Sequence, residues 1–258
     1  MNLSENDTLK RRSLILEMLD KQGDLSVIKL SKLYKVSEVT IRNDLSKLEE
    51  KGLLIRTRGG AIKNIPITYD LSLNQRVNKN KKEKQRIGKK ALDFIKDGHT
   101  IVMDSGSTTL EIAKNLGKFK NLKLITNSLP IADNVADLDE VEVIVPGGIL
   151  RSEMRSLVGP MAERNLLNYY CDVAFLAVDG IDADHGIFTP VIYEATLCKT
   201  MMEISKMVIV VCDSSKFLRK SFVKIAPINN IDVIITDSGI PEAEKNKLEE
   251  LKIKVIIV

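Results

Sequence analysis

Seven short runs rich in isoleucine and valine, spread from Thr100 to the last residue, limit the folds open to this chain more than any other feature. Runs of this length and composition are typical of strands buried on both faces of a sheet. Helical patterns lie between them, for example over residues 109–116 and 242–251. Alternating strands and helices predict an α/β domain with a mostly parallel sheet. The predicted strands are residues 100–104, 122–126, 141–145, 172–178, 208–212, 232–236 and 254–258.

Polar residues follow five of these strands at their carboxyl ends, which is where parallel sheets bind ligands. After the first strand the chain turns back at Gly106 and enters a helix, whose free N–H groups and nearby hydroxyls favour an anion. A phosphorylated polyol fits the whole set, with its phosphate on the N–H groups and Lys216 and its hydroxyls on carboxylates and an amide. The candidate effector-binding residues are Asp104, Ser105, Gly106, Ser107, Thr108, Thr109, Asn127, Gly147, Gly148, Arg151, Asp179, Gly180, Glu194 and Lys216.

Two of these assignments have a plainer alternative. The hydroxyls after the first strand could simply cap the helix that they precede, and Glu194 could cap a helix instead of entering the pocket. Capping alone does not account for polar residues at five strand ends together, so the ligand interpretation is preferred.

The first sixty residues carry a different pattern. Apolar spacing predicts helices over residues 9–22 and 27–34, and a third helix that ends near residue 51. Ser26 and Ser37 precede the second and third helices, and serine is a favoured N-cap residue. A short helix, a tight turn and a longer helix form the pattern of a helix-turn-helix.

The third helix has one apolar and one polar side. Ile41, Leu45 and Leu48 fall within one arc of the helix and are expected to face the core. On the other side, arginine can read guanine, asparagine can read adenine, and a small apolar group can touch a thymine methyl in the major groove. The alternative is a solvent-exposed face with a single exposed valine. The candidate DNA-binding residues here are Ser37, Val39, Thr40, Arg42, Asn43, Ser46 and Lys47.

A β-hairpin is predicted after the third helix. An apolar strand is followed by Arg56 and Arg58 and by a turn at Gly59 and Gly60. Glycine allows positive φ and a close approach to a phosphate backbone, so Arg56, Arg58 and Gly59 complete the candidate DNA-binding set. A hairpin in this position predicts a winged helix-turn-helix domain over residues 1–62.

The charge distribution favours a polyanionic partner for the first part of the chain. Residues 1–90 carry 21 basic and 11 acidic side chains, whereas residues 91–258 carry 18 and 24. A DNA backbone requires such a basic surface, because each neutralised phosphate releases counterions. The alternative is a solvated basic surface without a partner. We expect a basic linker over residues 63–78, followed by an effector-binding and oligomerisation domain over residues 79–258.

Several residues keep a fixed spacing across the helix-turn-helix and its wing, namely residues 36–45, Leu48, Glu49, Gly52 and residues 56–61. They resemble the N-terminal signature of the DeoR family of bacterial transcription regulators, and the strand-end motifs resemble its sensor domain, which is related in fold to ribose-5-phosphate isomerase. The family typically has a second arginine in place of Asn43 and often has histidine in place of Arg58. The resemblance implies a regulator, usually a repressor, of sugar-metabolism genes. It also implies that a phosphorylated sugar releases it from double-stranded operator DNA and that it forms a homodimer or a higher homo-oligomer.

A sugar-phosphate isomerase is the alternative from another class. Asp179, Asp182, Glu194 and Lys216 could supply a base and an electrostatic stabiliser. The isomerase pattern has an acidic residue where Ala183 stands here, and its glycine-rich segment before a catalytic glutamate is missing. The chain is therefore predicted not to be an enzyme. A DNA-binding oligomer without a ligand is the third alternative.

No cofactor, metal ion or membrane contact is expected. His99 and His185 lie far apart and have no ligand spacing with a cysteine, and no apolar run approaches the ~18 residues of a membrane span. The three cysteines cannot all pair within the chain, and the N-terminus has no secretory signal pattern. Buried free thiols and a cytoplasmic location are the predicted outcome.

Overall fold

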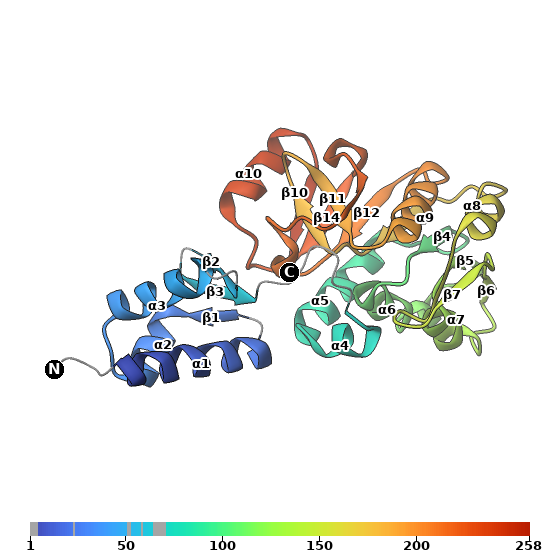
Figure 1. Cartoon of the computed structure of the whole chain (residues 1–258). Coiled ribbons are helices and arrows are strands. Elements are labelled where there is room, and N and C mark those ends of the chain that lie inside the picture. The colour runs from blue at the N-terminus through green and yellow to red at the C-terminus, as the bar shows by residue number, and fades with distance from the viewer. Residues whose placement is uncertain (1–4, 23, 51–52, 58, 64–70) are drawn as a thin grey trace. The chain divides into compact units, whose positions relative to one another are not determined.

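The computed structural model describes residues 5–22, 24–50, 53–57, 59–63 and 71–258. The chain divides into two compact units between Pro66 and Ile67 (Figure 1). The first unit holds the blue and cyan elements of Figure 1, and the second runs from green-blue to red. In the described part of the chain, no helix has both the length and the apolar character that crossing a membrane requires.

Three helices and a small antiparallel sheet of order β1-β3-β2 form the N-terminal unit. Its core holds Ile15, Leu30, Ile41, Leu45 and Leu54, each at most 1% exposed. The apolar side of the third helix therefore faces inwards, as predicted. The elements are α1 (Glu5–Gln22), β1 (Asp24–Ser26), α2 (Val27–Tyr34), α3 (Glu38–Glu50), β2 (Leu54–Thr57) and β3 (Gly60–Lys63).

Local contacts explain the turn between α2 and α3. Lys35 adopts the left-handed conformation, with φ of 52°, and ends α2. The backbone N–H of Thr40 donates to Ser37 Oγ at 3.1 Å, which confirms Ser37 as the N-cap of α3. Ser26 is the N-cap residue of α2, as predicted, although its side chain accepts no capping hydrogen bond from the described backbone.

A seven-stranded parallel sheet forms the centre of the C-terminal unit, with the order β15-β14-β12-β9-β4-β5-β6. Each strand lies within one of the predicted isoleucine and valine runs. The α/β fold class is therefore confirmed. The strands are β4 (Thr100–Met103), β5 (Leu122–Thr126), β6 (Val141–Ile144), β9 (Val173–Leu176), β12 (Val208–Val211), β14 (Val233–Thr236) and β15 (Lys254–Ile257).

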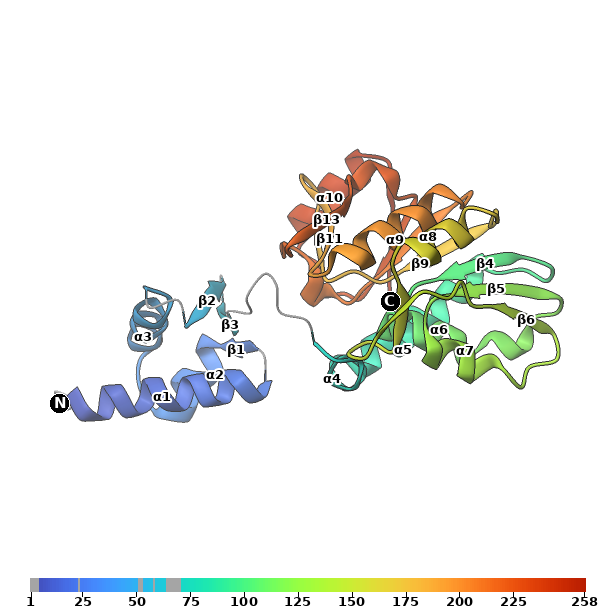
Figure 2. The ribbon, with the colours of Figure 1, turned by 45° about the vertical axis from the view of Figure 1, so that its right-hand side comes forward.

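Helices cover both faces of this sheet, which explains why its strands are apolar on both sides. Ile101 and Met103 of β4 join one core with α5, α6 and α7, whereas Val102 joins the other with α8, α9 and α10. Figure 2 shows α8 and α9 on the opposite side of β4 and β5 from α6 and α7. The helices are α5 (Lys81–Ala91), α6 (Ser107–Ala113), α7 (Leu129–Val135), α8 (Pro160–Leu166), α9 (Ile192–Glu203) and α10 (Glu242–Glu250).

Two smaller sheets, one further α-helix and four short 3-10 helices complete the described part of this unit. Helix α4 lies inside the stretch for which the sequence analysis predicts a linker, and the N–H of Leu73 in α4 donates to the carbonyl of Glu153 at 2.9 Å. The small sheets are a β7-β8 hairpin and an antiparallel sheet of order β10-β11-β13. The elements are α4 (Leu73–Asn78), β7 (Ile149–Arg151), β8 (Ser156–Val158), β10 (Gly180–Asp182), β11 (Gly186–Thr189) and β13 (Val223–Ala226).

Candidate functional site

Helix α3 presents its predicted polar side to solvent. Arg42, Asn43 and Lys47 are exposed, while Thr40 and Ser46 on the same helix are half-buried. Val39 is 62% exposed, which leaves its methyl groups free to contact a base. The side chains that the sequence assigns to base reading are thus accessible from one side of one helix.

Two ion pairs involve this side of α3. Arg42 Nη2 lies 2.7 Å from Glu38 Oε2, and Lys47 Nζ lies 2.8 Å from Glu50 Oε2. All four side chains are more than two-fifths exposed, and such exposed pairs contribute only ~0–1 kcal/mol. A phosphate or a base edge can therefore replace either carboxylate at little cost.

Arg56 of the wing contacts the same helix. Its Nη1 donates to Ser46 Oγ at 2.6 Å, and its backbone N–H donates to Glu49 Oε1 at 2.8 Å. Two residues predicted to bind DNA, Arg56 and Ser46, are therefore in direct contact. Arg58 lies outside the described residues.

The end of the wing depends on Gly60 rather than on Gly59. A Cβ at Gly60 would lie 1.7 Å from the carbonyl oxygen of Leu25 on β1, whereas a Cβ at Gly59 would meet nothing within 4 Å. Neither glycine is among the described glycines with a positive φ, so the expected positive φ is not observed, while the expected close approach to a phosphate backbone stays a prediction. The glycine at position 60 is required because β3 packs directly against β1.

Asp44 is a structural residue of the DNA-binding unit that the sequence analysis did not single out. It lies on the inner side of α3 and is 2% exposed. Its two carboxylate oxygens each lie 2.7 Å from an Nε atom, one of Arg11 and one of Arg12 on α1. This carboxylate therefore ties α1 to the exposed helix that carries Arg42 and Asn43.

In the C-terminal unit, two adjoining cavities share Arg76, Gly106 and Ala177. The polar side chains of the first, here called the acidic cavity, are Arg76, Asp104, Ser105, Asn127, Asp179, Thr189 and Glu194. The polar side chains of the second, here called the basic cavity, are Arg76, Lys79, Lys84, Ser107, Thr108, Asp213, Ser215, Lys216 and Arg219. The carboxyl ends of the parallel strands thus meet at one place, where most of the predicted effector residues lie.

Five predicted effector residues line neither cavity. Two of the three glycines serve packing, because a Cβ at Gly148 would lie 2.5 Å from the carbonyl oxygen of Val158 and one at Gly180 would lie 2.3 Å from that of Arg219, whereas Gly147 has open space around it and a positive φ of 75°. Gly148 also has a positive φ of 117°. The five residues are Thr109, Gly147, Gly148, Arg151 and Gly180.

Asp104 organises the loop between β4 and α6. Its Oδ1 accepts hydrogen bonds from the N–H of Gly106 at 3.1 Å and from Thr109 Oγ1 at 2.9 Å, and its Oδ2 accepts from the N–H of Ala177 at 2.9 Å. Burial raises the pKa of Asp104 to about 6, against the opposing effect of these hydrogen bonds. The carboxyl group therefore holds the loop in place from within the chain.

Asp179 is the centre of an ion-pair cluster. Its Oδ1 lies 2.6 Å from Arg76 Nη1 and 3.3 Å from Lys216 Nζ. Burial raises the pKa of this carboxyl, but Lys216 and Arg76 more than reverse the effect and hold the pKa at about 2. Its Oδ2 lies 3.5 Å from Thr189 Oγ1. Of the two carboxylate oxygens, Oδ2 is therefore the less strongly bound within the chain.

Asn127 carries an unused hydrogen-bond acceptor in the acidic cavity. The residue is 2% exposed, and its Nδ2 donates to the carbonyl of Leu157 at 3.1 Å. Its Oδ1 is buried and accepts no hydrogen bond from any described residue. Because buried polar atoms are rarely left without a partner, this oxygen points to a donor that the chain itself does not supply.

Lys84 links the basic cavity to helix α4. It is 4% exposed, and its Nζ donates to the carbonyls of Arg76 at 2.5 Å and of Lys79 at 2.7 Å. Burial lowers the pKa of Lys84 to about 8, against the opposing charge of Asp213. Lys84 belongs to the basic part of the chain that was expected to be solvated or to contact DNA. The structure instead buries it in the sensor unit.

The donors for an anion in the basic cavity differ in part from the prediction. The N–H of Gly106 donates to Asp104 and is already used. The hydroxyls of Ser107 and Thr108 have no hydrogen-bond partner in the described ranges. A Cβ at Gly106 would lie 2.2 Å from Ala177 Cβ, so the loop accepts only glycine at this position.

Arg151 and Glu194 form a contact at the edge of the acidic cavity. Arg151 Nη1 pairs with Glu194 Oε1, and Thr189 Oγ1 donates to Glu194 Oε2 at 3.1 Å. Glu194 therefore lines the cavity, which is the position that the effector-binding alternative expects for it. Arg151 does not line the cavity itself but contacts Glu194, which does.

Four basic residues of the site were absent from the predicted set, namely Arg76, Lys79, Lys84 and Arg219. The signal for the first three was the excess of positive charge in residues 63–90. For Arg219, the only signal in the sequence was its position shortly after Lys216. Burial lowers the pKa of Arg219 from its ordinary value, against the charges of Asp179 and Asp213.

Three cysteines are buried and free, as predicted. Cys198 lines the acidic cavity and Cys212 lines the basic cavity. Burial raises the pKa of the Cys171 thiol to about 12 and raises that of the other two thiols as well. All three thiols therefore remain protonated near neutral pH and react slowly.

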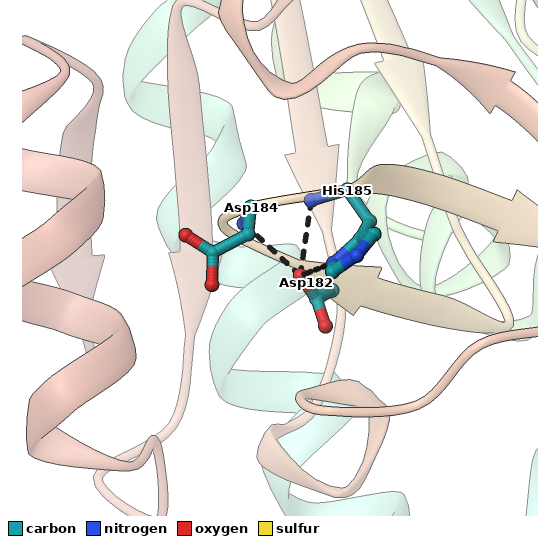
Figure 3. Close-up of side chains that lie close together, drawn as sticks. All are labelled: Asp182, Asp184 and His185. Carbon is teal, nitrogen blue, oxygen red and sulfur yellow. Dashed lines mark hydrogen bonds and ion pairs between the residues drawn. The ribbon is translucent and has the colours of Figure 1, made fainter.

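One cluster of metal-ligating side chains lies in the described part of the chain, at the turn between β10 and β11 (Figure 3). Asp182 Oδ1 accepts hydrogen bonds from the N–H groups of Asp184 and His185 and contacts His185 Nδ1 at 2.7 Å. Figure 3 shows the Asp184 carboxylate pointing away from Asp182, and this carboxylate pairs with Lys247. These contacts are those of a hydrogen-bonded turn.

Comparisons with known proteins agree with this arrangement. Residues 79–238 match the family described as "DeoR C terminal sensor domain", and residues 11–65 match "DeoR-like helix-turn-helix domain". The chain is 39% identical over 253 residues to the putative aga operon transcriptional repressor of Escherichia coli O157:H7, covering 97% of this chain and 94% of that protein. It is 34% identical to the transcriptional repressor AccR of Agrobacterium fabrum, covering 98% of both chains.

A winged helix-turn-helix unit joined to a sensor unit defines a DNA-binding transcriptional regulator. The chain belongs to the DeoR family of such regulators, and its relatives are transcriptional regulators rather than enzymes. Among solved structures, ribose 5-phosphate isomerase A of Methanocaldococcus jannaschii is similar with a TM-score of 0.40 and 19% identity, over 54% of this chain and 55% of that chain.

Proposed function

We propose that this regulator is a repressor of sugar-metabolism genes and that a phosphorylated sugar releases it from its operator. The observation that carries the proposal is Asn127 Oδ1, a buried acceptor without a donor in the described chain, which lines a cavity next to a second cavity rich in cations. A ligand with hydroxyl groups at one end and a phosphate at the other fits both requirements.

In this proposal the phosphate binds in the basic cavity. Lys84, Lys216 and Arg219 supply positive charge there, and the hydroxyls of Ser107 and Thr108 donate hydrogen bonds. Hydrogen bonds between charged groups of opposite sign are roughly twice as strong as neutral ones. The basic cavity therefore provides most of the affinity.

The sugar hydroxyls bind in the acidic cavity. They donate to Asn127 Oδ1 and to Asp179 Oδ2, the two acceptors least used by the chain itself. A buried acceptor that lacks its donor rejects ligands without the matching hydroxyl. The acidic cavity therefore determines the specificity for the sugar. Asp104 keeps the loop between the two cavities in position.

On DNA, α3 enters the major groove and the wing lies along the phosphate backbone. Val39, Arg42 and Asn43 read bases, and Lys47, Arg56 and Arg58 contact phosphates. Two copies of the chain read two half-sites about one turn of DNA apart. The names of the two repressors to which the chain is similar support repression, and the protein acts in the cytoplasm, where the operator is.

A thermal-shift screen of the full-length protein against phosphorylated sugars tests the effector site. A ligand that binds only the native state raises stability by RT ln(1 + [L]/Kd). We expect one phosphorylated sugar to raise the melting temperature of the wild type and of Lys224→Met, an exposed control lysine, but not of Lys216→Met. If no phosphorylated sugar at millimolar concentration changes melting temperature or operator affinity, the sensor assignment is wrong. Turnover of ribose 5-phosphate by the wild type would favour an isomerase instead.

A further inference from the structure

The surface around α8 and the start of α9 exposes large apolar side chains that the fold does not use. Six of them, each more than half exposed, define what is here called the α8–α9 face: Ile149, Leu150, Met161, Leu167, Tyr170 and Ile192. Three of the five tyrosines in the chain, Tyr169, Tyr170 and Tyr193, are exposed in or beside this face. Tyrosine and methionine are enriched where proteins contact each other.

Contacts within the unit bring together the elements that carry most of these side chains. Ile149 Cδ1 lies 3.2 Å from the position of a Cβ on Gly159, so the hairpin strand β7 covers the start of α8. Thr196 Oγ1 of α9 donates to Glu163 Oε1 of α8 at 2.7 Å. Figures 1 and 2 both show α8 and α9 side by side.

The exposure is not explained by the packing of α8 on its own sheet. Ala162 and Leu166 of α8 already fill the core, and both are fully buried. Met161 of this seven-residue helix and Leu167, its C-cap residue, are 58% and 60% exposed. A helix that is apolar on both its inner and outer sides is typical of an element buried in a larger assembly, and contiguous apolar patches of this kind mark interaction sites.

A second copy of this chain is the partner that fits the face. The N-terminal unit presents one recognition helix, whereas helix-turn-helix proteins read two half-sites as two-fold dimers. A two-fold interface uses the same patch on both subunits, so it must be complementary to itself. All six residues of the α8–α9 face are uncharged, and an uncharged apolar patch can meet its own copy without repulsion.

We propose that the α8–α9 face is the surface through which two copies of the chain associate. The inference rests on the dimer of the proposed function and names its interface. Glu194, which lines the acidic cavity and pairs with Arg151, follows Ile192 in the first turn of α9. The dimer interface therefore lies close to the effector cavity, since Ile192 and Glu194 belong to the same turn of α9.

Sedimentation velocity of the full-length protein at micromolar concentration tests the interface. The wild type and Leu251→Glu, a control at a 50% exposed apolar residue after α10, are expected to sediment as dimers. The double variant Met161→Glu/Leu167→Glu is expected to sediment as a monomer, with its effector thermal shift retained. A dimeric double variant, or a monomeric Leu251→Glu, overturns the interface. A wild-type monomer in the presence of operator DNA overturns the dimer of the proposed function itself.

Thiol labelling gives a second readout that does not depend on disrupting the dimer. Because the three native cysteines are buried, a cysteine introduced at an exposed position becomes the accessible thiol. We expect a maleimide dye to label Met161→Cys at least tenfold more slowly than Leu251→Cys in the dimer. Equal labelling rates at the two positions overturn the proposal.

Discussion

Replacing Asp179 by asparagine keeps the shape of the side chain and removes the charge at the centre of the sensor site. Asp179 is 18% exposed and lies 2.6 Å from Arg76 Nη1 and 3.3 Å from Lys216 Nζ. Its pKa of about 2 lies below the ordinary value of 3.8, and a tenfold change in an ionisation equilibrium corresponds to about 1.4 kcal/mol. The charged form of Asp179 therefore stabilises the native unit by ~2 kcal/mol at neutral pH.

The expected loss is measurable by thermal unfolding. For a unit of this size, ~1 kcal/mol corresponds to about 2–4 °C in Tm, so Asp179→Asn is expected to lower the Tm of the C-terminal unit by about 4–8 °C at pH 7. Asp139→Asn, a control at an exposed carboxylate, is expected to stay within ~0.5 kcal/mol of the wild type.

The pH dependence of this difference follows from the direction of the pKa shift. Because the pKa of Asp179 is lower in the folded state than in the unfolded state, its contribution is complete above about 3.8 and disappears as the pH falls towards about 2. The part of the gap that comes from Asp179 itself is therefore constant between pH 5 and pH 8, whereas Asp104, whose pKa of about 6 is raised in part by the charge of Asp179, makes the gap slightly smaller above pH 6 than at pH 5. Equal stability of wild type and variant at pH 7 would refute the assignment of Asp179 as an ion-paired carboxylate.

Two further predictions concern the DNA-binding unit. Arg42→Ala is expected to weaken specific operator binding by ~1–3 kcal/mol and to relax base choice at one position; in competition gel shifts, an equal loss on operator and random DNA would argue against base reading. Asp44→Ala leaves Arg11 and Arg12 without their shared buried carboxylate and is expected to destabilise this unit by ~3 kcal/mol. Hydrogen exchange of α3 amides measures this loss, and unchanged protection would contradict it.

The sequence predicts the large sheet well because its signal is simple. Strands buried on both faces need continuous apolar runs, and residues 208–211 and 233–236 provide them without interruption. The antiparallel sheet with β10 and β11 has no such signal, because these strands have only three and four residues and β11 also pairs with β13, a strand far away in the chain. Short strands held by distant contacts carry little local information.

The candidate site was predictable where its residues follow a strand directly. Asp104, Asn127 and Asp179 come straight after β4, β5 and β9 or within three residues of them, and they line the same cavity. Arg76 was not predictable, since it reaches Asp179 from a helix 103 positions earlier in the chain. The polar composition predicts a linker there, because nothing in the local sequence indicates that α4 packs on the sensor unit.

The central claim is that occupation of the sensor cavities controls binding to the operator. The most direct measurement is fluorescence anisotropy of labelled operator DNA with full-length protein, titrated with the phosphorylated sugar that gives the largest thermal shift. We expect the sugar to weaken operator binding by the wild type, and we expect Lys216→Met to bind operator with wild-type affinity but not to respond to the sugar. A sugar that binds and stabilises the protein without changing operator affinity would contradict the claim, because a ligand shifts an equilibrium only through different affinities for its two states.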